Sequence, residues 1–143
     1  MFLSFKTELK PNNQQITSFR KHCGVARHAY NFGNAVILDA LKLRETDKSV
    51  KIPSATDLHK KLVAEVKTAN PWYYESSKAS PQQALTEVRK AWDRCFKKVS
   101  KQPRFKKKGK SNDSFYLEQG TVAKPGISND GKKLNYLKLD GSD

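Results

Sequence analysis

The feature of this sequence that most constrains its fold is a run of basic residues between Arg94 and Lys110. It contains nine lysines and arginines and no acidic residue. Like charges at this density repel one another and cannot share a core, so the run must lie at the surface. The whole chain of 143 residues carries a net charge of +14. Such an excess favours a polyanionic partner, with nucleic acid ahead of an anionic membrane surface and of a merely solvated basic face.

The basic run supplies the candidate binding residues. A lysine offers a mobile point charge, and an arginine can donate two parallel hydrogen bonds to one phosphate. Several phosphates neutralised together would release counterions from the nucleic acid. We therefore predict phosphate contacts by Arg94, Lys97, Lys98, Lys101, Arg104, Lys106, Lys107, Lys108 and Lys110. Phe105, within the run, is either a small apolar anchor or a stacking partner for a base or sugar.

A long helix is predicted near the N-terminus. Asn12 or Asn13 can cap it, and apolar residues then recur at helical spacing. Gly24 and Gly33 lie inside this stretch, where each costs about 1 kcal/mol relative to alanine. The two glycines therefore indicate close packing or a kink in this helix.

Two further helices have clear start signals. Ser54 followed by Asp57 resembles a capping box, in which each side chain bonds the backbone N–H of the other residue. For the third helix, Ser80 is the expected N-cap, with Pro81 in the first helical position and Gln83 completing a capping box. One face of this third helix is expected to be apolar and to carry Leu85, Val88, Trp92, Phe96 and Val99.

An aromatic cluster, Trp72, Tyr73 and Tyr74, lies between the second and third helices. Aromatic residues beside a helix end more often belong to the core than to a binding site. A stacking platform for unpaired bases is the alternative that stays open. Gln82 and Gln83 would read adenine edges only if the third helix entered a groove, and capping is the favoured role of Gln83.

Strand-like patterning flanks the helices. Residues 2–9 alternate apolar and polar side chains, as a half-buried strand does. After the basic run, residues 114–118 and 134–139 are also strand-like, the second behind a turn signal at 129–131. The predicted order is one strand, a helical insert and then further strands, which indicates an α+β fold.

Other kinds of chemistry find little support. His22, Cys23 and His28 do not share one helical face, and neither Cys23 nor Cys95 belongs to a CxxC pair, so we predict no metal and no cofactor. The acidic residues are scattered, and no trio is placed to hold two divalent ions, so we predict no catalytic residue and no enzyme. No apolar run approaches the ~20 residues of a spanning helix. We expect a cytoplasmic protein with no membrane partner and no small-molecule substrate.

Five blocks of the sequence resemble the N-terminal part of the OrfB/TnpB proteins of insertion sequences. One block, around Arg27, Tyr30 and Asn31, is similar to the family's Arg-x-x-Tyr-Asn stretch. Nothing in the chain resembles the family's RuvC-like nuclease part with its acidic triad, or its zinc-ribbon cysteines. The blocks follow the family's order, at residues 5–11, 24–32, 70–72, 80–85 and 103–109, and residues 113–115 resemble the family's entry into the next strand.

The resemblance implies a relation to RNA-guided DNA nucleases that are similar to compact type V CRISPR effectors. The N-terminal part of such proteins grips the guide RNA and the guide–target heteroduplex. The resemblance adds Arg27 and Tyr30 as candidate nucleic-acid contacts. It also implies that the strands form a small β-barrel, complete or incomplete, which the helical bundle interrupts. The predicted division is a barrel-like part at 1–11 and 112–143, a helical recognition-like insert at 12–100 and a basic loop at 101–111.

We therefore predict a nucleic-acid-binding module that contacts structured RNA or an RNA–DNA duplex through its phosphates and has no catalytic domain. Two alternatives stay open. One is a helix-turn-helix module of a transposase that binds duplex DNA, and the other is a truncated remnant without function.

Overall fold

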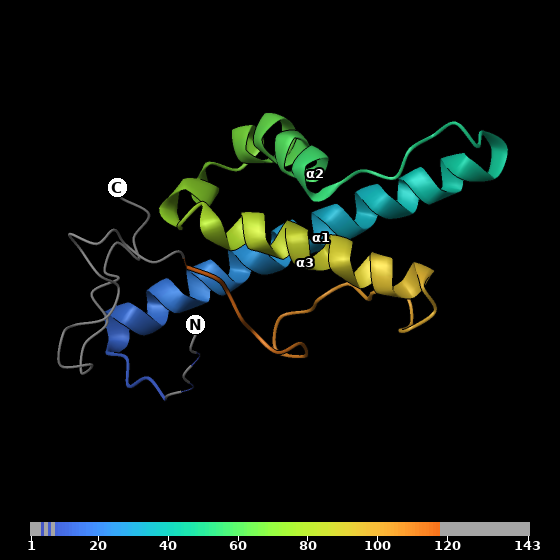
Figure 1. Cartoon of the computed structure of the whole chain (residues 1–143). Coiled ribbons are helices and arrows are strands. Elements are labelled where there is room, and N and C mark those ends of the chain that lie inside the picture. The colour runs from blue at the N-terminus through green and yellow to red at the C-terminus, as the bar shows by residue number, and fades with distance from the viewer. Residues whose placement is uncertain (1–3, 5, 7, 118–143) are drawn as a thin grey trace.

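The computed structural model describes residues 4, 6 and 8–117, and these form a helical body (Figure 1). A π-helical turn continues the second helix, and a 3-10 turn precedes the third. After the third helix the chain runs back along the first helix without regular secondary structure. The elements in chain order are α1 (Asn13–Thr46), α2 (Ala55–Lys61), η1 (Leu62–Lys67), η2 (Pro71–Glu75) and α3 (Ala79–Phe96).

The starts of α1 and α2 are the predicted ones. Asn12 is the N-cap of α1: its side chain accepts from the Gln15 N–H, and the Gln15 side chain accepts from the Asn12 N–H, both at 2.9 Å. Ser54 and Asp57 form the same reciprocal capping box at the start of α2. Each box satisfies backbone donors that the first turn of a helix leaves without partners. Both predictions are confirmed.

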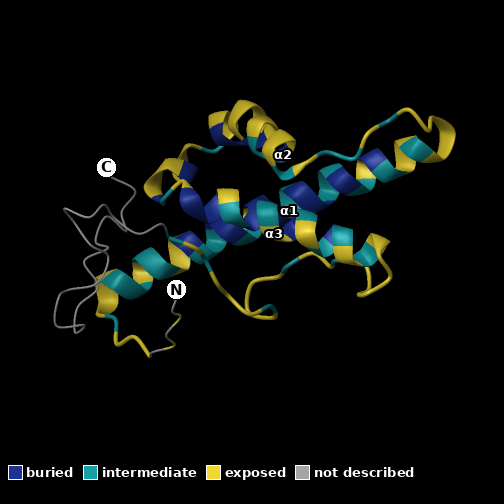
Figure 2. Ribbon diagram, viewed as in Figure 1, coloured by how far each residue is buried: buried dark blue, intermediate teal, exposed yellow. Residues whose placement is uncertain are grey.

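Helices α1 and α3 lie side by side and run in the same direction. Residues further along α1 contact residues further along the segment that contains α3. His22 contacts Ser77, just before α3, and further along both helices Asn34 contacts Trp92. Figure 2 shows the buried residues concentrated where α1, α2 and α3 meet. The core there is apolar and includes Val25, Ala29, Ile37, Leu58, Leu62, Tyr73, Leu85, Val88 and Trp92.

Gly33 lets the helices approach closely. A Cβ atom at this position would lie 2.9 Å from Val88 Cγ1, closer than real Cβ atoms come, and 3.0 Å from Leu85 Cδ2, which is tighter than most real Cβ contacts. The predicted close packing is therefore confirmed at Gly33. A Cβ at Gly24 would meet nothing nearer than the Arg27 guanidinium at 3.9 Å, so packing does not explain that glycine.

The start of α3 differs from the prediction. Its N-cap is Lys78, which makes no side-chain capping bond, and Ser80 lies buried inside the first turn. The Ser80 hydroxyl donates instead to the Tyr116 carbonyl at 2.9 Å. The prediction of Ser80 as N-cap is wrong because the helix begins before this residue: the Ser80 N–H already donates to the Ser77 carbonyl at 3.2 Å.

The predicted apolar face of α3 is confirmed only in its first part. Leu85, Val88 and Trp92 are buried, whereas Phe96 and Val99 are exposed. The helix ends at Phe96, so helical periodicity no longer sets the direction of the Val99 side chain.

The predicted α+β fold with a β-barrel is wrong for the described part of the chain, which is all-α. Residues 8–10 form no strand, and residues 114–117 pair with no strand among those described. The predicted strand at 134–139 lies outside the described residues, and the division into domains stays a prediction. An alternating pattern specifies an extended segment with one apolar side, but a strand also needs a neighbour to receive its backbone hydrogen bonds.

The extended chain after the basic run packs on helices instead. Residues 103–117, here called the return segment, run antiparallel to α1: the partner on α1 moves from Asn34 back to Phe19. Near its end the ring of Phe115 packs on Phe19 and His22, with centroids 5.6 and 5.0 Å away. Backbone groups of the segment bond to side chains of α1 and α3. The apolar side chains of the strand-like pattern are therefore accommodated by a pair of helices and not by a sheet.

Candidate nucleic-acid interface

The basic run begins with a sharp reversal at the end of α3. The Lys98 N–H donates to the Cys95 carbonyl at 3.0 Å and the Val99 N–H to the Arg94 carbonyl at 2.9 Å, which is a Schellman motif. Lys98 takes the left-handed conformation, with φ at 60°, that glycine adopts most easily. The reversal sends the following basic residues back along α1 (Figure 1).

Most of the basic run is open to solvent. Eight of its nine basic residues are exposed, and the exception is the half-buried Lys106. In the part of the chain that the structure describes, none of the nine forms an ion pair. Exposed cations without a carboxylate partner are available to phosphates. Their contacts with nucleic acid remain predictions.

Asn31 on α1 fixes the path of the return segment at Lys106. Its Oδ1 accepts from the Lys106 N–H at 2.7 Å, and its Nδ2 donates to the Lys106 carbonyl at 2.9 Å. The two bonds reproduce what a neighbouring strand would offer that residue. The Lys106 ammonium lies 4.3 Å from the centre of the Tyr30 ring, a cation–π contact that covers this ring.

Two further contacts hold the return segment on either side of its lysines. The Arg27 guanidinium pairs with Asp113 at 2.8 Å, and the Arg27 side chain is only 18% exposed. Asn34 is fully buried, where it accepts from the Trp92 indole N–H at 2.8 Å. The Nδ2 of Asn34 lies 3.5 Å from the Pro103 carbonyl and donates to it. Helix α1 thereby holds the segment at three points.

Arg27 and Tyr30, predicted as nucleic-acid contacts through the family resemblance, make contacts within the protein. Tyr30 is buried beneath Lys106, and the Arg27 guanidinium is paired. Both side chains therefore help to position the return segment. A contact of either one with nucleic acid stays a prediction.

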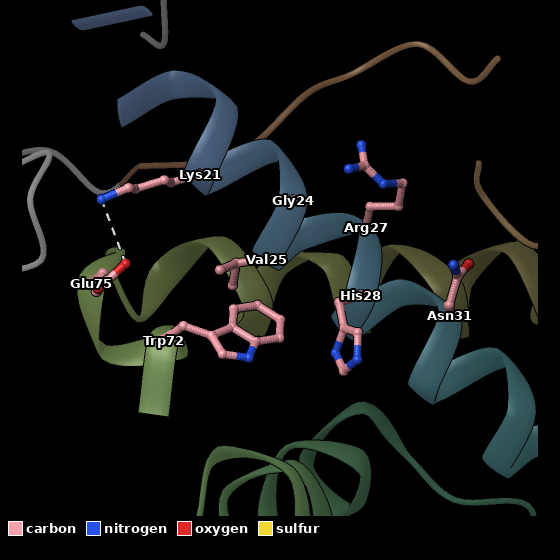
Figure 3. Close-up of a pocket in the computed structure, with 8 residues that line it drawn as sticks. All are labelled: Lys21, Gly24, Val25, Arg27, His28, Asn31, Trp72 and Glu75. Carbon is pink, nitrogen blue, oxygen red and sulfur yellow. Dashed lines mark ion pairs between the residues drawn. The ribbon is translucent and has the colours of Figure 1, made fainter. Parts of the chain in front are cut away.

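A shallow pocket of about 390 Å³ opens between α1 and η2 (Figure 3). At one end of it, the Lys21 ammonium and the Glu75 carboxylate lie 3.5 Å apart. At the other end is Asn31, which also holds the return segment. The lining residues come from α1 and η2 and are Lys21, Gly24, Val25, Arg27, His28, Asn31, Trp72 and Glu75.

The three residues of the aromatic cluster have different surroundings: Tyr73 lies in the core, Trp72 lines this pocket and Tyr74 lies at the surface outside it. Tyr73 is buried, as the favoured interpretation predicts, whereas Trp72 and Tyr74 are exposed. Burial raises the pKa of the Tyr73 hydroxyl far above its usual range, so the hydroxyl donates to His28 Nδ1 at 2.6 Å. Burial also lowers the pKa of His28, which favours the neutral ring with its proton on Nε2.

His22 is a satisfied core histidine. Its Nδ1 donates to the Ser18 carbonyl at 2.8 Å, and its Nε2 accepts from the Ser77 N–H at 3.1 Å. Both ring nitrogens are thus used by the neutral form, and burial lowers the pKa of the ring. Since both nitrogens bond within the protein, His22 is not placed as a metal ligand.

Within the described residues there is no group of three histidine, cysteine or acidic side chains that could hold a metal ion. Cys23 and Cys95 are unpaired and half-buried. Burial, with Asp113 nearby, raises the pKa of the Cys23 thiol, which lowers its reactivity. None of the described helices is long and apolar enough to cross a membrane.

The residues that hold the return segment are not among those predicted from the sequence for that role. Arg27, Asn31 and Asn34 recur at i, i+4 and i+7, so they share one face of α1. A polar stripe on a helix that otherwise builds the core is the signal that could have indicated a docked segment. Its partners, Lys106 and Asp113, could not be identified because they lie about half the chain away.

Comparison with known proteins agrees with the resemblance inferred from the sequence. Residues 1–45 match the helix-turn-helix domain model of the OrfB family of IS605-type elements. Over 119 residues the chain is 29% identical to InsQ of Escherichia coli K12, whose name assigns it provisionally as an RNA-guided DNA endonuclease. This alignment covers 82% of the chain and 28% of InsQ, so the chain spans less than a third of that relative.

The resemblance to the OrfB/TnpB family is therefore confirmed. The matched domain associates the chain with nucleic-acid binding in transposable elements. No catalytic domain is evident in what is matched.

Proposed function

We propose that this chain is the nucleic-acid-binding N-terminal module of a transposon-associated RNA-guided nuclease. It binds a structured RNA or an RNA–DNA duplex through phosphate contacts along the basic run. The nucleic-acid-binding part of this proposal has the support of the family match. The proposal that the chain belongs to an RNA-guided nuclease rests on the similarity to InsQ, and it goes beyond what that partial alignment covers.

One observation carries the proposal: the protein's own side chains hold the return segment on α1. Asn31 holds both backbone groups of Lys106, and the neighbouring Lys107 and Lys108 stay exposed. Fixing the backbone of a free loop costs about 1–2 kcal/mol per residue, and binding would otherwise bear that cost. A docked path lets the lysines meet successive phosphates without it.

The salt dependence of binding tests the electrostatic part. If about five to eight phosphates are neutralised on a duplex, log affinity should fall against log salt with a slope of about −4.5 to −7. Changing Lys107 and Lys108 together to alanine should make this slope shallower by about 1.8. A flat salt response would overturn the proposal.

A matched control is the double change of Lys60 and Lys61, which are also exposed, to alanine. These lysines end α2, on the other side of the body from the return segment in Figure 1. The control should leave the slope close to that of the unchanged protein. Equal effects of the two double variants would mean that net charge, and no particular surface, attracts the nucleic acid.

Duplex DNA bound by a helix-turn-helix is the second candidate, favoured by the description of the matched domain. That motif needs two helices joined by a short turn, so that the second enters the major groove. The described part of residues 1–45 instead contains one helix, which runs on to Thr46. Competition among a structured RNA, an RNA–DNA hybrid and duplex DNA of equal length separates the candidates, and a preference for duplex DNA would favour this second one.

A further inference from the structure

The pocket beside Trp72 is not used by the phosphate contacts proposed above. Its volume of about 390 Å³ falls at the lower end of the range of about 300–1,000 Å³ that small ligands occupy. We propose that this pocket receives one unpaired nucleotide, whose base stacks on Trp72 while its phosphate meets Lys21. The inference rests on the proposed function, because the bound nucleic acid delivers the nucleotide.

Trp72 is a stacking surface that is already fixed in place. Its indole N–H donates to Asn70 Oδ1 at 3.2 Å, and Asn70 Nδ2 donates to the Val66 carbonyl at 2.9 Å. The indole also packs on Tyr73, with ring centroids 4.6 Å apart. Despite these contacts Trp72 remains 40% exposed. A rigid and open aromatic ring can stack a base without first being ordered.

The lining combines apolar surface with charged and hydrogen-bonding side chains, which suits a nucleotide better than a purely apolar ligand. Lys21 is paired with Glu75, but both side chains are more than half exposed, and such a pair contributes little to stability. A phosphate can therefore replace the carboxylate as the partner of Lys21. The His28 Nε2–H, left over by the Tyr73 hydrogen bond, is a further donor for a base or phosphate oxygen. Figure 3 shows these side chains around the opening.

The position of the pocket connects it with the basic run. Asn31 lines the pocket and also bonds the backbone of Lys106. A strand whose phosphates follow the return segment would therefore pass the pocket mouth, where an unpaired base could turn inward. Gly24 leaves the α1 side of the pocket open, since a side chain there would extend into open space.

Tryptophan fluorescence of the full chain tests the inference directly. Trp72 should report stacking, whereas Trp92 is 3% exposed and bonded to Asn34, so it should stay silent. Three ligands with equal numbers of phosphates are compared: single-stranded oligoadenylate, the same strand with abasic sites and a blunt duplex. Testing oligoadenylate both as RNA and as DNA distinguishes whether the nucleotide comes from an RNA strand or from a DNA strand. Only strands with unpaired bases should quench the emission, and Trp72→Phe should abolish the signal.

Binding of the variants gives a second readout. Trp72→Ala should weaken oligoadenylate binding by about fivefold or more, and leave binding of the blunt duplex unchanged. Tyr74→Ala is the matched control, because Tyr74 is a more exposed aromatic residue that does not line the pocket. Gly24→Met blocks the pocket without deleting a side chain and should abolish quenching, and Glu75→Gln should strengthen oligoadenylate binding.

Failure of the pocket proposal and failure of the proposed function are distinguishable. If oligoadenylate and the abasic strand bind equally, with a steep salt dependence and no quenching, the pocket proposal is overturned and the proposed function stands. If none of the three ligands binds, the proposed function fails as well. Equal losses from Trp72→Ala and Tyr74→Ala would also overturn the pocket, since any surface aromatic residue would then serve.

Discussion

Replacing Asn31 with alanine should release the middle of the return segment without removing any of its charge. The amide makes two hydrogen bonds to Lys106, at 2.7 and 2.9 Å. A hydrogen bond contributes a net 0.5–1.5 kcal/mol in typical cases, so the pair stabilises docking by about 1–3 kcal/mol. Because a factor of ten corresponds to about 1.4 kcal/mol, the docked state should lose about 5- to 150-fold in its local equilibrium constant.

The assay combines hydrogen exchange with binding at several salt concentrations. The Lys106 amide should exchange faster by up to the same factor, while amides in the α1–α3 core keep their protection. Nucleic-acid affinity should fall by at most that factor, because the competent conformation is less populated. The salt slope should stay unchanged, since every basic residue remains. Loss of charge and loss of position thus give different signatures.

Asn112→Ala is the matched control, because Asn112 is exposed and makes no hydrogen bond with the described residues. It should change neither exchange nor affinity. The reasoning is refuted if Asn31→Ala binds with normal affinity although the Lys106 amide has lost its protection. In that case docking of the return segment would be irrelevant to binding.

Two further predictions concern stability. Lys98→Gly should raise the free energy of unfolding by about 1 kcal/mol in denaturant titrations, because glycine adopts the φ of 60° without strain, and a decrease would contradict the strain at the α3 end. Stability should also fall as the pH drops below about 6.5, since burial lowers the pKa of His22, His28 and His59 and the unfolded chain therefore binds protons first. The free energy of unfolding should change by at most about 1.4 kcal/mol per pH unit for each histidine, and His22→Gln should make this slope shallower. A free energy of unfolding that stays constant or increases as the pH is lowered from 7 to 5 would exclude buried neutral histidines.

Local signals in the sequence were reliable where the interaction itself is local. The Asn12–Gln15 and Ser54–Asp57 boxes each span three residues, so the sequence contains both partners of every bond. Gly33 was likewise predictable as a close-packing position, although Val88 and Leu85 were not identifiable as its neighbours.

Interactions between residues far apart in the sequence could not be predicted from such local signals. Ser80 looks like an N-cap in the sequence, yet it lies inside the first turn of α3 and its hydroxyl donates to the Tyr116 carbonyl, 36 residues on. Phe115 belongs to a strand-like pattern, yet its ring packs on Phe19 and His22 of a helix. In both cases the sequence indicates a polar or apolar requirement and leaves open which distant group meets it.

The blocks that carry the family resemblance are contact partners in the fold. Arg27 and Asn31, in the second block, bond the stretch that contains Lys106, in the fifth block, and Asp113 just after it. The resemblance therefore follows the contacts that position the basic run as well as the basic residues themselves. If position matters as much as charge, the intact lysines of an Asn31→Ala variant cannot maintain full affinity. An Asp113→Asn change, which adds no positive side chain and weakens the pair with Arg27, should then lower affinity even though the net charge becomes more positive.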